Sequence, residues 1–266
     1  MIKQLVIIFL TITFSVIFSS AQSTDNVKHA LCHKTNEEIV IDGLFDEQAW
    51  QQTEWITDFE DIRGSGFAKY ATQVKTLYSN DYLFVAVMFY EPHICANFTE
   101  NEQKIYLDNA FELFIDPDGD GLNYYEFEIN ANGATWDLQL SKPYRRGGTS
   151  NSGWNIDGLK KAIFINGTLN NPTDIDSLWT IELAIPFSAF DEYANGTYPA
   201  NGEQWKVNFL RVGWNYNIVG EKYVKKTDKN GKPLQSDLWV WSPQMKVNMH
   251  IPERWGIIEF NLENRK

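Results

Sequence analysis

The feature that most constrains this chain is a series of short apolar or alternating segments, each closed by a cluster of turn-forming residues. Residues 124–130 alternate, so that three apolar side chains face one way while Glu126 and Glu128 face the other. A period of two places successive side chains on opposite faces of a strand. Residues 83–90 are almost continuously apolar, which is typical of a strand covered on both faces. The chain is therefore predicted to be built from β-strands.

Helix is scarce by the same criteria. Strands are predicted at residues 74–78, 83–90, 111–116, 124–130, 162–165, 179–185, 204–213, 238–241 and 255–262. Turn clusters separate them at fairly regular intervals, as in a β-sandwich or barrel. Single helical turns are expected at residues 46–51, with Asp46 as the N-cap, and at residues 188–193. The polar stretch 220–236 holds five lysines and predicts a long exposed loop.

The first residues predict export. Lys3 precedes the largely apolar run 5–18, and residues 19–21 offer small side chains for cleavage. The run is shorter than the ~20 apolar residues of a spanning helix, and no later segment is apolar enough, so no membrane span is expected once the signal is removed. We expect a signal peptide at residues 1–21, a lead-in at 22–38 and one domain at 39–262, in the periplasm or outside the cell.

Charge and cysteine content narrow the partners. The net charge of −12 repels phosphate backbones and acidic membranes, so nucleic acid is not an expected partner, whereas neutral sugars carry no such penalty. Cys32 and Cys95 are the only cysteines. An oxidising compartment permits one bridge between them, and the alternative is two buried thiols.

Several strings, in their shared order, resemble the family 9 carbohydrate-binding modules. They are IDGLFDEQAW at residues 41–50, DNAFELFID at 108–116, YYEFEIN at 124–130, DSLWTIELAIPF at 176–187, VNFLR at 207–211, and WSP with HIPERWG between 241 and 256. The resemblance covers roughly residues 39–260. It implies an all-β fold, a jelly-roll-like β-sandwich of two antiparallel sheets with long loops. It also implies non-catalytic binding of polysaccharide or oligosaccharide, association with glycoside hydrolases, and calcium in some members.

The resemblance also implies a carbohydrate site. In members that bind sugar chain ends, two facing tryptophans clamp the ring. Tyr106 stands at the first clamp position and Met249 near the second. Glu128 stands where an arginine contacts sugar hydroxyls, and Glu112 matches a glutamate of the family's strand. We therefore expect Tyr106, Glu112, Glu128 and Met249 at the site.

Two further residues are candidates from their own chemistry, because a sugar binder needs flat aromatic surfaces and a few fixed polar groups. Trp154 follows several glycines in a polar stretch and is either a loop anchor or a ligand platform. Arg211 alternates with apolar residues and must be paired if it is buried. It is either a structural ion pair, with Glu112 as the partner considered, or a donor to sugar hydroxyls.

The turn after residue 115 is a candidate metal site. Asp116, Asp118 and Asp120 alternate and are followed by Gly121, as in the first half of an EF-hand calcium loop. The second half fails, because Phe127 stands at position twelve. The loop is either a calcium site or a solvated hairpin turn.

Two other functions stay open. Glu126 and Glu128 lie about 6.5–7 Å apart on a strand, which a xylanase-like glycoside hydrolase acting on O-glycosyl bonds could use, although exposed strand faces also carry such pairs routinely. A structural or redox-associated surface domain is the third class. Haem ligation by the adjacent Met249 and His250 is disfavoured, because on a strand they would point to opposite faces.

Overall fold

The computed structural model describes residues 27–190 and 198–262. The predicted signal peptide, the start of the lead-in and the end of the second helical turn lie outside these ranges. Among the described residues, no helix has the length and apolar character to cross a membrane.

Strands dominate the described chain. They are β1 (His29–Lys34), β2 (Glu60–Asp61), β3 (Thr72–Tyr78), β4 (Tyr82–Tyr90), β5 (Ala110–Asp116), β6 (Tyr124–Asn130), β7 (Thr135–Leu140), β8 (Ser150–Asn151), β9 (Lys160–Asn166), β10 (Leu178–Pro186), β11 (Gln204–Gly213), β12 (Tyr216–Val219), β13 (Lys222–Lys225), β14 (Asp237–Val240) and β15 (Gly256–Asn261). The helical elements are α1 (Gln48–Gln52) and the single turns η1 (Ile105–Leu107), η2 (Tyr144–Arg146), η3 (Phe187–Phe190) and η4 (Pro252–Arg254).

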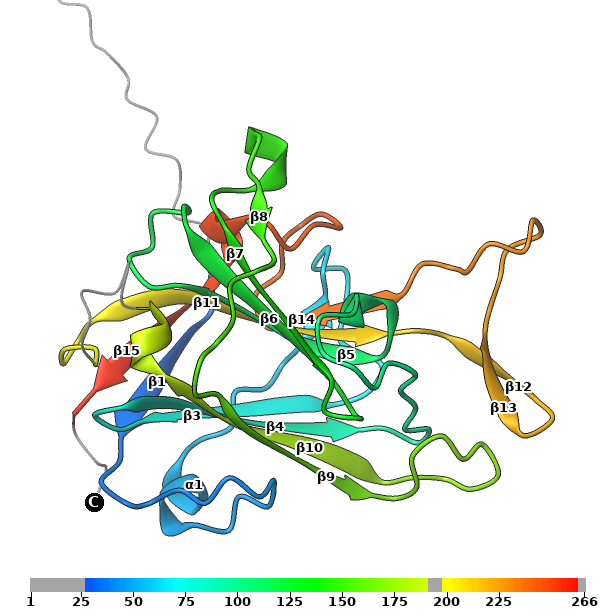
Figure 1. Ribbon diagram of the computed structural model, residues 1–266, viewed down its shortest axis with the longest axis horizontal. Coiled ribbons are helices and arrows are strands. Elements are labelled where there is room, and N and C mark those ends of the chain that lie inside the picture. Colours follow the sequence, from blue (N-terminus) through cyan, green and yellow to red (C-terminus); the bar gives the residue numbers. More distant parts are fainter. Residues whose placement is uncertain (1–26, 191–197, 263–266) are drawn as a thin grey trace, which may run out of the picture.

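The strands form a sandwich whose two layers belong to one continuous sheet (Figure 1). Its order is β8-β7-β6-β5-β11-β15-β1-β3-β4-β10-β9, and β14 joins the second half of β11. Strand β1 is parallel to both β15 and β3, so it carries the sheet from one layer into the other. The predicted all-β sandwich is confirmed. Its layers, however, are not two purely antiparallel sheets.

The main core lies between the layers. Tyr125, Phe127 and Ile129 of β6 face into it, as their alternation predicts, together with Val85 and Val87 of β4. The other face of β4 is covered as well, since Phe84 and Ala86 pack in a separate cluster around Trp50 of α1. The prediction that this strand is buried on both faces is confirmed.

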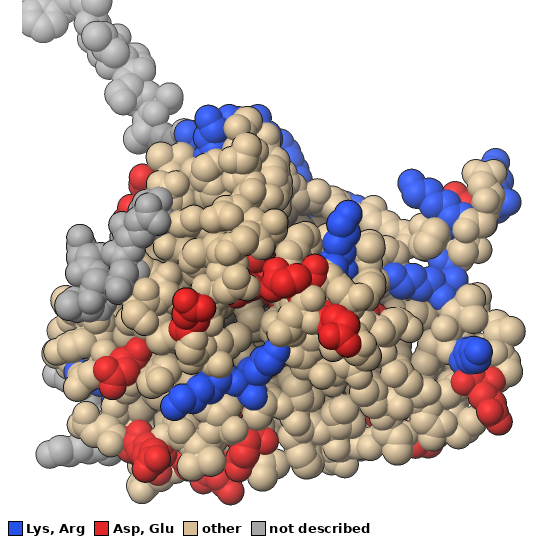
Figure 2. All heavy atoms as spheres, viewed as in Figure 1, with Lys and Arg blue, Asp and Glu red and all other residues tan. Residues whose placement is uncertain are grey.

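The structure differs from the sequence prediction at several elements. Helix α1 begins one residue later than predicted, and Glu47 rather than Asp46 is its N-cap, with no side-chain cap hydrogen bond. Strands β1, β2, β7, β8 and β12 were not predicted. Within the polar stretch 220–236, β13 pairs with β12 in a separate hairpin, and the rest is mostly exposed. Figure 2 shows lysine and arginine side chains gathered on this projecting segment.

Candidate functional site

A cavity of about 510 Å³ lies on the outer face of the layer formed by β11, β5, β6 and β7. Three kinds of side chain line it. Aromatic residues are Tyr106, Trp136, Tyr144 and Trp214; apolar residues include Leu138, Leu210, Val212, Leu238 and Met249; and the acidic residues are Glu112, Glu126 and Glu128. A cavity with mostly apolar walls and a few convergent polar groups is the usual form of a small-molecule site.

Strand register builds the floor of this cavity. Leu210 of β11 pairs with Glu112 of β5, Glu112 with Glu128 of β6, and Glu128 with Trp136 of β7. Directly paired residues point to the same side of a sheet. The four side chains therefore form one row across four strands, facing away from the main core.

The aromatic wall consists of Tyr106, Trp136 and Trp214. The rings of Tyr106 and Trp136 stack with centroids 5.8 Å apart and planes inclined by 29°, and Tyr106 stays 37% exposed. The indole Nε1 of Trp214 donates to the carbonyl oxygen of Tyr106 at 3.1 Å. Lys225 lies over the Trp214 ring, 3.6 Å from its centroid, and donates to the carbonyl of Leu107. These contacts fix flat aromatic surfaces at the cavity mouth.

The three glutamates meet at the floor, where one carboxylate oxygen of each lies within 4.8 Å of the others. Glu112 is 5%, Glu126 6% and Glu128 1% exposed. Glu128 accepts a hydrogen bond from the backbone N–H of Tyr106 at 2.6 Å. Glu112 and Glu126 have no hydrogen bond or ion pair with any residue in the described ranges. The expectation that Glu126 and Glu128 lie on an exposed strand face is therefore wrong.

Burial shifts the titration of all three carboxyls. Loss of solvent, and then repulsion from Glu126, raises the pKa of Glu112 well above its usual range. Burial followed by repulsion from its two neighbours does the same to the pKa of Glu128, against the opposing effect of the Tyr106 N–H. Burial raises the pKa of Glu126 to about 8. Without a cation, the cluster therefore holds protons near neutral pH.

Met249 and His250 both line the cavity, because they lie in a loop rather than on a strand. The strand geometry that would point the two side chains to opposite faces does not apply here. Met249 forms an apolar wall, while its carbonyl accepts from the indole of Trp255 at 2.8 Å. His250 Nδ1 lies 2.9 Å from the Tyr124 hydroxyl. Burial, and then the charge of Arg145, lowers the pKa of His250 to about 4, so this imidazole is neutral at neutral pH.

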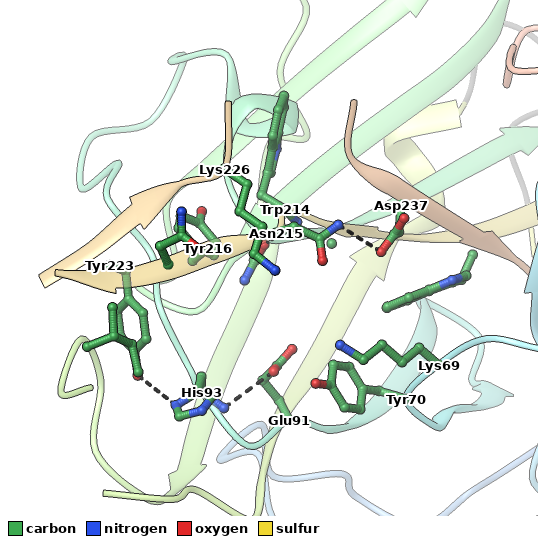
Figure 3. Close-up of a pocket in the computed structure, with 15 residues that line it drawn as sticks. Lys69, Tyr70, Glu91, His93, Trp214, Asn215, Tyr216, Tyr223, Lys226 and Asp237 are labelled. Atoms are coloured by element: carbon green, nitrogen blue, oxygen red, sulfur yellow. Dashed lines mark hydrogen bonds between the residues drawn. The ribbon is translucent and has the colours of Figure 1, made fainter. Parts of the chain in front are cut away.

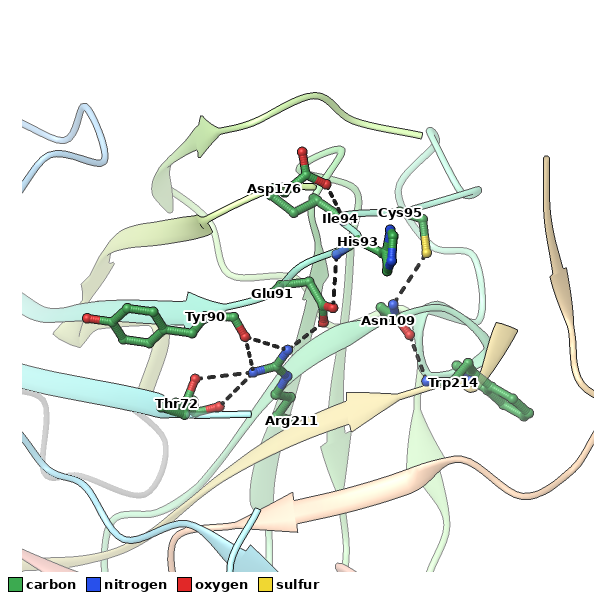
Figure 4. A network of polar contacts seen from close by, with 11 residues as sticks. Thr72, Tyr90, Glu91, His93, Ile94, Cys95, Asn109, Asp176, Arg211 and Trp214 are labelled. Carbon is green, nitrogen blue, oxygen red and sulfur yellow. Dashed lines mark hydrogen bonds and ion pairs between the residues drawn. The ribbon is translucent and has the colours of Figure 1, made fainter. Parts of the chain in front are cut away.

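Arg211 lies on the opposite face of the sheet from the cavity, because it alternates along β11 with Leu210 and Val212, which line the cavity. Figure 4 shows its contacts. Its guanidinium donates to the carbonyl of Tyr90 at 3.2 Å, to the Thr72 hydroxyl at 3.3 Å and to the Glu91 carboxylate at 2.5 Å. Arg211 pairs in register with Phe111, not with Glu112, so its partner could not be Glu112. The structural ion pair is confirmed, with Glu91 as the acid, and it ties β11 to the facing layer.

Trp154 also lies away from the cavity. Its ring packs 4.7 Å from that of Tyr125, which faces the main core. Of the two interpretations drawn from sequence, this packing fits the loop anchor.

A second cavity, of about 340 Å³, lies between the β12–β13 hairpin and the sandwich (Figure 3). Its acidic side chains already have partners. Glu91 binds Arg211, and Asp237 accepts from Asn215 at 3.0 Å. Tyr223 contacts His93 at 3.1 Å. Since these polar groups satisfy one another, the cavity over the unpartnered glutamates is the stronger candidate.

The aspartate turn brings Asp116, Asp118 and Asp120 together, with one oxygen of each within 4.8 Å of the others. Asp116 is buried and accepts from the backbone N–H groups of Gly119 at 3.1 Å and Gly121 at 2.9 Å. Burial is the main cause that raises the pKa of Asp116 to about 7. Hard oxygens at this spacing fit calcium, although the backbone bonds alone also account for the turn.

The two cysteines are separate, buried thiols. Cys32 lies in the main core, and Cys95 is 3.4 Å from the amide nitrogen of Asn109. Of the two alternatives, the structure has the unbridged one.

Comparison with known proteins agrees with this geometry. The family model described as "Carbohydrate-binding family 9" matches residues 54–224. No curated protein matches the chain. Among solved structures, a family 9 module from Caldicellulosiruptor kristjanssonii in complex with cellotriose is 15% identical, with a TM-score of 0.55, covering 89% of this chain and 95% of that one.

Two further structures share the fold. The Caldicellulosiruptor kristjanssonii module in complex with glucose is 16% identical, with a TM-score of 0.55, covering 90% of this chain and 98% of that one. A candidate carbohydrate-binding protein from Bacteroides uniformis is 18% identical, with a TM-score of 0.62, covering 89% of this chain and 100% of that one. The family model spans more than half of the sequence, and the chain therefore belongs to carbohydrate-binding family 9.

Proposed function

We propose that this chain binds polysaccharide or oligosaccharide in the cavity over Glu112, Glu126 and Glu128, and does not cleave it. The observation that supports this most directly is the exposed Tyr106 ring stacked on Trp136 beside buried carboxyl groups. The C–H face of a sugar packs on an aromatic ring, and its hydroxyls require fixed polar partners.

The state of the carboxyls argues against hydrolysis. A glycoside hydrolase needs one protonated and one ionised carboxyl, about 5–5.5 Å apart in retaining enzymes or about 6.5–9.5 Å apart in inverting ones. Here burial raises the pKa of every member, which disfavours the ionised partner that either mechanism needs. The one hydrogen bond to the cluster within the described chain, from the Tyr106 N–H to Glu128, opposes this rise but does not reverse it.

Binding and turnover can be separated in one assay. Purified protein is titrated calorimetrically with cello- and xylo-oligosaccharides, and reducing ends are followed over the same interval. We expect saturable binding without new reducing ends, and weaker binding by Trp136→Ala. Turnover that Glu128→Gln abolishes would instead identify a glycoside hydrolase.

Calcium is a subsidiary proposal for the aspartate turn. Asp116, Asp118 and Asp120 would supply its oxygens, and the ion would hold the turn by neutralising their repulsion. A ligand that binds only the folded state stabilises it by ~2.7 kcal/mol at a hundred times Kd. Calcium should therefore raise the Tm, and Asp118→Asn combined with Asp120→Asn should remove that rise. A Tm indifferent to calcium and chelator would leave only the turn.

Export, and association with glycoside hydrolases outside the cytoplasm, belong to the same proposal and rest on the sequence of residues 1–21 and on family membership. Cell fractionation with N-terminal sequencing of the mature protein tests the first. Co-purification with the hydrolases of the same cells tests the second.

A further inference from the structure

We propose that the ligand of this cavity carries an ammonium group, and that it is an amino sugar with a free amine rather than a neutral sugar. This inference rests on the proposed function, because it takes the cavity over the glutamates to be the sugar site.

The first argument is that two buried acidic side chains have no partner in the fold. Glu112 and Glu126 are more than nine-tenths buried, line the cavity and have no hydrogen bond or ion pair within the described chain. Buried carboxylates elsewhere on the same layer have partners. Asp108, for example, accepts from the backbone N–H groups of Asn97 and Phe98. Since an unpaired buried acid is costly, these two carboxyls lack a group that the ligand can provide.

The neighbouring cationic side chains do not provide that group. Lys225 is held by the carbonyl of Leu107 and the ring of Trp214. Arg145 makes a two-pronged ion pair with Glu253, with both contacts under 3 Å. His250 is neutral, as its lowered pKa shows, and is bound to the Tyr124 hydroxyl. A positive charge that pairs with the ionised glutamates therefore has to come from the bound molecule.

The shape of the cavity favours an organic cation over a metal ion. Calcium needs six to eight oxygen ligands, whereas the three carboxyls are surrounded by aromatic and aliphatic carbon. The volume, about 510 Å³, is that of a small-molecule site. A sugar ring on Tyr106 could direct a ring amine to the floor. An –NH₃⁺ group has three N–H donors, one for each glutamate.

Binding of an ammonium group should be coupled to proton release from the glutamates, and this release can be measured. The empty cluster holds protons because its carboxyls have raised pKa values. An ammonium group favours the ionised carboxylates, so binding an amino sugar releases protons. A neutral sugar has no charge with which to drive that release.

The experiment compares three ligands of equal length by isothermal titration calorimetry. They are oligosaccharides of glucosamine, of N-acetylglucosamine and of glucose. Titrations are run at a pH low enough to keep the ligand amine protonated, and buffers of different ionisation enthalpy report proton release. We expect the glucosamine oligomer to bind at least tenfold more tightly than the other two, with protons released for it alone.

Two variants test the cause. Glu112→Gln keeps the shape of the side chain and removes one charge, and it should reduce the preference for the amine to less than threefold. Glu259→Gln is the matched control, because Glu259 lies on β15, outside the cavity, bonded to Gln204. It removes one charge as well and should leave the preference intact. Matching circular dichroism spectra and melting curves establish that both variants are folded.

The outcomes separate the two proposals. Equal affinity for the glucose and glucosamine oligomers overturns the ammonium inference and leaves sugar binding standing. Binding of the neutral sugar that requires calcium and is lost in Glu112→Gln would make the cluster a metal site and also overturn it. No affinity for any of the three, or for xylo-oligosaccharides, overturns both proposals.

Discussion

Two buried ionisable groups lie on opposite faces of the same layer, and the fold satisfies only one of them. On the inner face, Arg211 of β11 has its charge met by Glu91 and its N–H groups met by backbone and hydroxyl oxygens (Figure 4). On the outer face, Glu112 of the adjacent strand β5 has no hydrogen bond or ion pair within the described chain, and two other acids, Glu126 and Glu128, lie beside it.

The difference separates a structural charge from a functional one. Burying a charge is costly, and the cost is recovered only when the charge is paired and hydrogen-bonded within the fold. Arg211 recovers it by joining the two layers. The glutamates do not, so their cluster is a place where a ligand can relieve an unfavourable interaction. Perturbed, unpaired carboxyls in a cavity are a mark of function.

The largest effect on stability is expected from breaking the ion pair between Arg211 and Glu91. Arg211→Met leaves Glu91 without its cation, and removing one member of a buried pair costs about 3–5 kcal/mol. For a domain of this size, each kcal/mol lowers the Tm by about 2–4 °C, so a fall of roughly 10 °C is expected in thermal unfolding.

The double variant Arg211→Met with Glu91→Leu is the control, because it removes both charges and should regain part of the lost Tm. If the single variant melts like the wild type, Arg211 is not a structural ion pair and the contrast between the faces disappears.

Removing an acid from the glutamate cluster should not destabilise the fold near neutral pH, in contrast to removing Arg211. Burial raises the pKa of Glu126 to about 8, whereas an unfolded Glu titrates near ~4.3. Between these values the folded state holds the proton that the unfolded state has lost, so the free energy of unfolding falls as pH rises. One such group contributes at most about 1.4 kcal/mol per pH unit.

Urea unfolding from pH 5 to pH 8 measures this slope. We expect Glu126→Gln to make it shallower, with a stability at pH 8 equal to or above that of the wild type. A variant less stable than the wild type at every pH would mean that Glu126 has a partner in the fold.

Sequence pattern predicts the strands of this fold well and their association poorly. The range predicted for β6 is the observed one, and that for β11 as well, because alternation reports which face of a strand is buried. The parallel pairing of β1 is invisible to alternation, since register and direction depend on residues more than 200 positions apart. Strand β7 alternates cleanly, with Trp136, Leu138 and Leu140 on one face, so its pattern could have predicted both the strand and Trp136.

The candidate site was predicted in part for the same reason. Resemblance led to Tyr106, Glu112, Glu128 and Met249, which the fold does bring to one cavity. It could not show that Glu126 joins them unpaired, because burial of an outer face depends on the loops that cover it. The alternation of side chains along β11 was enough to predict that Arg211 faces the apolar side. It could not identify Glu91 as the partner, because Glu91 comes from the other layer.

The smallest effect concerns the aromatic residues on the two faces, Tyr106 and Trp154. A sugar stacked on Tyr106 buries about 40–60 Å² of apolar surface, worth roughly 1–1.5 kcal/mol at ~25 cal/mol per Å². Tyr106→Ala should therefore weaken binding about five- to tenfold and change the Tm little, because the ring is 37% exposed. Trp154→Ala should do the reverse, since its ring packs on Tyr125 of the main core: a lower Tm with unchanged affinity. Calorimetric titration and melting of both variants decide the matter. If Tyr106→Ala loses stability and keeps its affinity, the outer cavity is not the sugar site.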